Sequence, residues 1–152
     1  MRALSKDLQE FIHLLNKAEV EFLIVGAWSA AVHGYPRYTA DLDLFVRSNP
    51  ENAKRLMIAL TEFGFGNIGV TSEDFLKPDY VVQLGVEPNR IDLLTGISGV
   101  SFEETWSARQ QIELQGERAW VISRDLLIRN KEASGRPKDL LDAEALKKIP
   151  SR

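Results

Sequence analysis

The chain has 152 residues, of which 44% are hydrophobic and 27% are charged, and its formal net charge is -3. This length fits a single domain over residues 1–152, and the acidic balance argues against a protein that coats nucleic acid through positive charge alone. The absence of cysteine excludes disulfides, thiolate metal sites and cysteine nucleophiles, and we expect a cytoplasmic protein because no apolar run suits a membrane span or a signal peptide.

The N-terminal third alternates helical and strand patterns. A helix with Ser5 as its N-cap is predicted over residues 5–18, because apolar residues recur there with helical spacing, at Leu8, Phe11, Ile12 and Leu15. A short apolar run over residues 21–26 predicts a buried strand that ends at a glycine. The alanine-rich segment over residues 27–33 predicts a short helix.

A second strand and helix follow. Apolar residues alternate with aspartates over residues 41–46, which is a strand pattern. Asn49 and Pro50 are typical of a helix start, and Gly64 is typical of its end.

The remainder of the chain combines strands with two helices. Four strands are predicted, over residues 80–86, 90–94, 110–114 and 118–122. Two helices then begin at Ser123 and Pro137 and end near Gly135 and Lys148. This order predicts an α/β (α+β) fold with a mixed β-sheet flanked by helices.

Three aspartates carry most of the functional signal. Asp41 and Asp43 are two residues apart in a predicted strand, so their carboxylates point to the same face, and no salt-bridge partner is evident beside them. Asp92 is embedded in another apolar strand, where an unpaired carboxylate is costly to bury. If the two strands are neighbours, all three carboxylates converge.

Converging carboxylates suit one or two Mg²⁺ ions, which prefer oxygen ligands and are often completed by substrate phosphates. Such a site fits phosphoryl or nucleotidyl transfer. Two alternatives stay open. Asp41 and Asp43 could lie on a solvated strand face, and Asp92 could pair with Arg90 or a distant lysine.

A glycine turn precedes the aspartates. Gly26, Ala27 and Ser29 follow the first predicted strand and open a helix, an arrangement that can present backbone N–H groups and a hydroxyl to a phosphate. An ordinary strand-ending turn is the alternative. Residues 118–152 hold nine Lys/Arg against five Asp/Glu, so a basic segment could fold back on an acidic pocket, or simply form a solvated helical face.

Taken together, these residues resemble the nucleotidyltransferase-fold superfamily related to DNA polymerase β, in which a strand ending in glycine precedes Asp-x-Asp and a third Asp follows on a later strand. The chain is most similar to bacterial minimal nucleotidyltransferases of the AbiEii toxin group, through Gly26, His33, Gly34, Arg37, Thr39, Asp41 and Asp43. A C-terminal motif of that group is matched by Lys131, Arg136, Lys138, Asp139 and Asp142.

The resemblance implies roles for these positions. The three aspartates would bind Mg²⁺ (or Mn²⁺), with Asp92 as third ligand or as base for an incoming hydroxyl. Lys131 would hold phosphates as part of the catalytic set. Substrate contacts are expected from Gly26, Ser29, Arg37, Thr39, Arg136, Lys138 and Asp139. The last three also have ordinary helix-surface explanations, such as a Lys138–Asp142 pair or an acid in a first turn.

The implied activity is Mg²⁺-dependent transfer of an NMP from an NTP to a hydroxyl of RNA such as tRNA, of a protein or of a small molecule. A toxin–antitoxin role is a further expectation, and an antitoxin or a second copy is the expected partner because no long C-terminal substrate domain is present. Ala27 replaces a second glycine, so a non-catalytic nucleotide- or partner-binding member of the fold is the alternative. A metal-dependent phosphohydrolase is a third reading, weakened because the chain has only His13 and His33.

Overall fold

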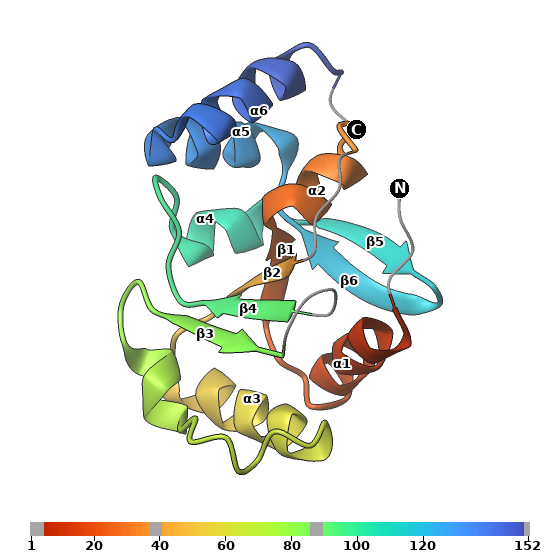
Figure 1. The fold of residues 1–152 in the computed structure, drawn as a ribbon, viewed down its shortest axis with the longest axis vertical. Coiled ribbons are helices and arrows are strands. Elements are labelled where there is room, and N and C mark those ends of the chain that lie inside the picture. The colour runs from red at the N-terminus through yellow and green to blue at the C-terminus, as the bar shows by residue number, and fades with distance from the viewer. Residues whose placement is uncertain (1–4, 37–40, 86–89, 151–152) are drawn as a thin grey trace.

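A six-stranded mixed β-sheet organises the protein (Figure 1). The computed structural model describes residues 5–36, 41–85 and 90–150. Its elements in chain order are α1 (Lys6–Lys17), β1 (Phe22–Val25), α2 (Gly26–Val32), β2 (Asp41–Val46), α3 (Pro50–Glu62), the 3-10 helix η1 (Ser72–Leu76), β3 (Val81–Leu84), β4 (Arg90–Leu94), α4 (Phe102–Ser107), β5 (Gln110–Leu114), β6 (Glu117–Val121), α5 (Arg124–Ser134) and α6 (Pro137–Lys147).

The strand order is β3-β4-β2-β1-β6-β5, so β3 and β5 form the edges. β2 runs parallel to β4, and β1 runs parallel to β6. The other three neighbouring pairs are antiparallel. This architecture, a mixed sheet with helices around it, confirms the fold class expected from the sequence.

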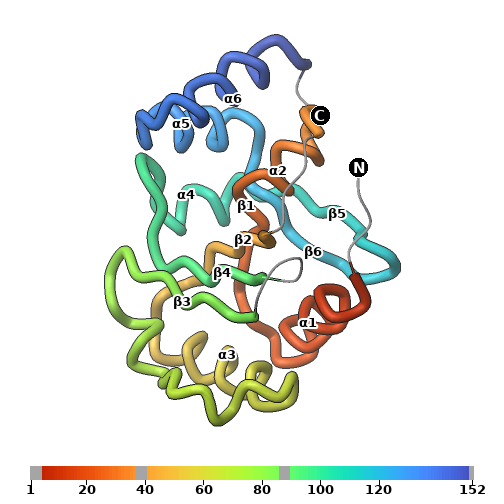
Figure 2. Tube along the Cα trace, viewed as in Figure 1, coloured from red at the N-terminus to blue at the C-terminus, as the bar shows by residue number. Residues whose placement is uncertain are grey.

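Helices cover both faces of the sheet. Figures 1 and 2 show α1 and α3 on one side and α2, α4, α5 and α6 on the other. The four apolar residues that predicted the first helix are all buried, as are Leu42 and Leu44 of β2. On the opposite face, Phe45 packs edge-on against Phe102 of α4, with ring centroids 5.1 Å apart.

Capping groups mark the start of three helices and the end of α5. The side chains of Ser5, Asn49 and Ser123 each accept a hydrogen bond from a backbone N–H in the first turn of the following helix. Gly135 ends α5 in the left-handed conformation, with φ at 71°. The short helices α4 and η1 were not predicted. Within the described parts of the chain, no helix combines the length and apolar character needed to cross a membrane.

Candidate active site

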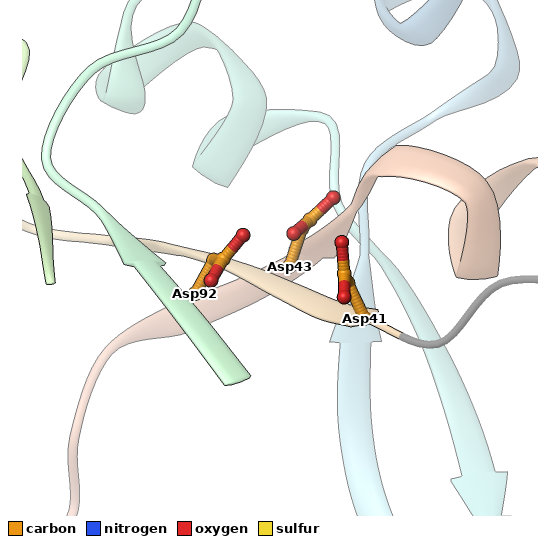
Figure 3. Close-up of side chains that lie close together, drawn as sticks. All are labelled: Asp41, Asp43 and Asp92. Atoms are coloured by element: carbon orange, nitrogen blue, oxygen red, sulfur yellow. The ribbon is translucent and has the colours of Figure 1, made fainter. Parts of the chain in front are cut away.

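The three aspartates meet at the centre of the sheet. Because β2 and β4 are parallel neighbours, Asp43 lies directly opposite Asp92, and Asp41 shares its face of β2 with Asp43. One carboxylate oxygen from each residue lies within 4.8 Å of the others. Figure 3 shows the three side chains rising from the same side of the two strands. The convergence expected from the sequence is therefore present.

Burial and mutual repulsion raise the pKa of two acids in this cluster, Asp43 and Asp92. Burial, together with the nearby charges of Asp92 and Asp41, raises the pKa of Asp43 to about 7. Burial also raises the pKa of Asp92, despite the opposing charge of Arg90. Three carboxylates whose charges oppose one another form an oxygen-rich set that a divalent cation would neutralise, so these residues fit Mg²⁺ or Mn²⁺.

Arg90 lies against two of these acids. Its Nη2 donates to Asp41 Oδ2 at 2.7 Å, and its Nε lies 3.4 Å from Asp92 Oδ1. The expectation that Asp41 lacks a salt-bridge partner is therefore wrong, because parallel pairing places Arg90 opposite Asp41. The alternative pairing suggested for Asp92 with Arg90 exists, but it occurs within the cluster and does not separate Asp92 from the other acids.

The glycine turn touches the acid cluster directly. Gly26 is the first residue of α2 and has φ at 67°, a conformation that favours glycine. A Cβ at this position would lie 2.3 Å from Asp43 Oδ2. Glycine is therefore required both by the backbone and by the carboxylate beside it.

The other residues of this segment divide between the pocket and the core. Ala27 lines the pocket from within α2, where helical backbone accommodates alanine. Ser29 is fully buried and donates its hydroxyl to the Gly26 carbonyl at 2.6 Å, so it supports the turn and does not line the pocket. Trp28 packs in the core, and His33 is buried with Nε2 2.7 Å from the Ile122 carbonyl oxygen.

A second charged cluster joins α5 to α6. The side chain of Lys131 is 7% exposed, and its Nζ lies 3.0 Å from Asp142 Oδ2 and 3.4 Å from Asp139 Oδ1. Asp139 also accepts from Ser134 Oγ at 2.6 Å and from Arg136 Nε at 2.9 Å. Burial would raise the pKa of Asp139, but the Ser134 hydrogen bond and the two neighbouring cations outweigh it and hold this pKa below its usual value.

The contacts of Asp142 and Asp139 bear on whether these acids of α6 are surface residues or belong to the pocket. Asp142 is buried and paired with Lys131, so it is not part of a solvated surface pair with Lys138. Asp139 lies in the first turn of α6 and also contacts Lys131 of α5 and Arg136 of the turn between the two helices.

A pocket of about 500 Å³ lies between the two clusters. The sheet and α2 contribute Asp41, Asp43, Asp92, Arg90, Gly26 and Ala27, whereas α5, α6 and the turn between them contribute Asn130, Lys131, Ser134, Arg136, Lys138, Asp139 and Asp142. The basic C-terminal segment thus does face the acidic cluster. Arg37 and Thr39 lie outside the described residues.

Sequence reasoning missed several residues of this pocket. The sequence suggests Arg90 only as a partner of Asp92, and it contains no pattern that marks Ser134, whose hydroxyl ties α5 to Asp139. Gln83 of the edge strand β3 lies opposite Asp92 and lines the same pocket. The alternation within residues 80–86 contained a signal for Gln83, since a polar residue there takes the face opposite its apolar neighbours.

Solved structures of other proteins share the fold of this chain. No protein-family model and no curated protein matches the sequence. A proposed nucleotidyltransferase from Thermotoga maritima is similar in structure, with a TM-score of 0.56 and 17% identity over 93% of this chain and 88% of that chain. A nucleotidyltransferase-like antigenic protein from Paracoccidioides brasiliensis is also similar, with a TM-score of 0.52 and 16% identity over 95% of this chain and 78% of that chain. The chain therefore has a nucleotidyltransferase fold.

Proposed function

We propose that this protein is a divalent-metal-dependent nucleotidyltransferase that transfers an NMP from an NTP to a hydroxyl group. The observation that carries the proposal is the convergence of Asp41, Asp43 and Asp92 on one face of the sheet, with carboxylate oxygens within 4.8 Å of one another. The nucleotidyltransferase fold of the two similar structures supports it. The cations of α5 and α6 across the pocket add a place for phosphates.

Each side chain has a role in this proposal. Asp41, Asp43 and Asp92 hold Mg²⁺ or Mn²⁺, which would neutralise charge on the triphosphate and steady the leaving pyrophosphate. Lys131, Arg136 and Lys138 attract the triphosphate. The backbone of Gly26 and Ala27 approaches it from the sheet side, and Ser29 holds that turn. Arg37 and Thr39 are assigned to substrate on the resemblance to the AbiEii group alone.

The transfer conserves atoms and charge as follows. The acceptor oxygen attacks the α-phosphorus of the NTP, and the bond from that phosphorus to the oxygen bridging the α- and β-phosphates breaks. Pyrophosphate leaves with the bonding electrons. Asp92, which lies in the same acid cluster, is the residue proposed to take the acceptor proton.

Labelled substrates test this proposal. Each α-labelled NTP is incubated with Mg²⁺ and total RNA or cell lysate, and labelled products are separated by sensitivity to ribonuclease and protease. We expect label on one acceptor class, lost in Asp41→Ala and Asp43→Ala and retained in Asp125→Ala, an exposed position on α5 outside the pocket. NTP binding that survives both substitutions without any transfer would support a non-catalytic binding protein. Phosphate release without a labelled acceptor would support a phosphohydrolase.

The cellular role follows from the resemblance to the AbiEii group. We propose a cytoplasmic toxin whose acceptor is tRNA or a protein and whose activity is blocked by an antitoxin or by self-association. Expression of the protein should then arrest growth, and expression of Asp43→Asn should not. Equal arrest by both proteins would contradict a toxic transferase activity.

A further inference from the structure

Arg90 occupies an unusual place for a basic residue. It is the first residue of β4, lies opposite Asp41 in the parallel register, and lines the same pocket as the acids. Its guanidinium contacts Asp41 at 2.7 Å through Nη2, and Asp92 at 3.4 Å through both Nη2 and Nε. Two of the three proposed metal ligands are thus engaged by one side chain of their own protein.

A metal ion and this guanidinium would draw on the same two carboxylates, those of Asp41 and Asp92. The carboxylates of Asp41 and Asp92 can compensate a cation near them, but a divalent ion within their reach repels a second cation at hydrogen-bonding distance. The guanidinium of Arg90 would therefore compete with a divalent ion for Asp41 and Asp92. A divalent ion held by these acids would therefore displace Arg90 from part of its contact with them.

The pocket offers Arg90 another partner. Its side chain is 32% exposed, so it can turn without disrupting the buried core. Lys131, Arg136 and Lys138 approach the pocket from α5 and α6, whereas Arg90 approaches from the sheet beside the acids. A triphosphate in this pocket would carry oxygens that suit the bidentate geometry of a guanidinium.

We infer that Arg90 is a positioning residue that compensates Asp41 and Asp92 in the metal-free protein and moves to the triphosphate when metal and nucleotide bind. The inference rests on the proposed function and explains how binding of the two ligands would be coupled. Nucleotide draws Arg90 away from the acids and so strengthens metal binding. By linkage, metal strengthens nucleotide binding by the same factor.

Mn²⁺ binding tests the inference without any measurement of transfer. Mn²⁺ affinity is measured by titration calorimetry at pH 7.5 for the wild type and Arg90→Gln, with and without a non-hydrolysable NTP analogue. We expect Arg90→Gln to bind Mn²⁺ alone at least about fivefold more tightly, and the gain in affinity on adding nucleotide to shrink by a similar factor. Arg90→Lys, which keeps the charge without the bidentate fork, should lie between the two.

Arg55→Gln is the matched control. The side chain of Arg55 is also 32% exposed, and it pairs with Glu51 at 2.7 Å on α3, away from the pocket. This variant should bind Mn²⁺ like the wild type. Unchanged or weaker Mn²⁺ binding in Arg90→Gln would overturn the inference, because it would mean that Arg90 only holds the acids in place. Equal Mn²⁺ affinity in the wild type and Asp43→Asn would instead refute the proposed metal site.

Discussion

Gly26 adopts a backbone conformation that favours glycine, and it lies directly against Asp43 of the acid cluster. Its φ of 67° disfavours any side chain, and an added Cβ would meet Asp43 Oδ2 at 2.3 Å. Gly116 provides a control, since it has φ at 90° but nothing within 4 Å of an added Cβ. We expect Gly26→Ala and Gly116→Ala each to lose about 1–2 kcal/mol of stability in urea unfolding from backbone strain.

The two variants should differ at the site. Gly26→Ala should also weaken Mn²⁺ binding about tenfold or more, because Asp43 must move away from the new methyl group. Gly116→Ala should leave Mn²⁺ affinity unchanged. Equal Mn²⁺ affinity in both variants would show that the approach of Gly26 to Asp43 is not needed by the site.

Asp43 should make the stability of the metal-free protein depend on pH. Its pKa is raised from 3.8 to about 7, so the folded protein takes up a proton that the unfolded chain releases between these values. The stabilisation by the protonated form is complete below about pH 4 and is lost as pH rises through 7. Asp43→Asn removes this loss, so at pH 8 without metal we expect it to exceed the wild type by up to about 4 kcal/mol, because each unit of raised pKa corresponds to about 1.4 kcal/mol.

Urea unfolding from pH 4 to pH 9 in EDTA measures this difference. The advantage of Asp43→Asn should grow with pH and level off above pH 8. Asp125→Asn, at an exposed position outside the pocket, should not alter the profile. A constant offset between Asp43→Asn and the wild type over the whole range would contradict the raised pKa.

At the scale of elements, helices α5 and α6 are joined by a buried ion cluster. Lys131 lies between Asp139 and Asp142, and loss of one partner from a buried pair leaves uncompensated charge. We expect Lys131→Met to lower stability by about 3 kcal/mol, and the double variant Lys131→Met/Asp142→Asn to recover part of the loss. Urea unfolding measures both.

Lys147→Met is the control for this cluster. Lys147 pairs with Glu132 and Glu144 on the same two helices but is exposed, so solvent screens its interactions. Its loss should change stability much less than the loss of Lys131. A similar effect of both substitutions would mean that burial adds nothing to the Lys131 pairs.

The sequence predicted long elements better than short ones. Ser5, Asn49 and Ser123 mark helices whose caps are local, so their starts could be read without knowing the rest of the fold. Helices α4 and η1 were missed because six and five residues give too few turns for a periodic pattern. A usable signal was present nonetheless, since Ser101 and Glu104 form a capping box at α4.

The sequence predicts those features of the site that depend on a single strand. It does not predict the features that depend on which strands are neighbours and in which register. The common direction of Asp41 and Asp43 follows from strand geometry alone. The position of Arg90 opposite Asp41 follows from the register of β2 with β4, which no local pattern specifies. Ser29 was misleading because its hydroxyl has a partner within its own turn, the Gly26 carbonyl.

At the scale of the whole molecule, the acid cluster lies on one face of the sheet, and β2 packs apolar side chains on the other. Leu42 and Leu44 of β2 are buried on one face, whereas Asp41 and Asp43 face the pocket on the other. The α5–α6 pair lines this pocket from across the site, so Asp41, Asp43 and Asp92 lie on one side of the pocket and Lys131 and Lys138 lie on the other. Ligands that bridge the two sides should therefore stabilise the folded protein as a whole.

Thermal unfolding measures this stabilisation. A ligand that binds only the native state adds about 2.7 kcal/mol at one hundred times its Kd, which for a chain of this size raises Tm by several degrees. We expect Mg²⁺ with a non-hydrolysable NTP analogue to raise the Tm of the wild type at pH 8, and EDTA to reverse the rise. Asp43→Asn should show little response to metal while starting from a higher metal-free Tm. Adding ligand should therefore bring the Tm of the wild type close to, or above, the Tm of Asp43→Asn. An equal rise in Tm of both proteins would argue against a metal held by Asp43.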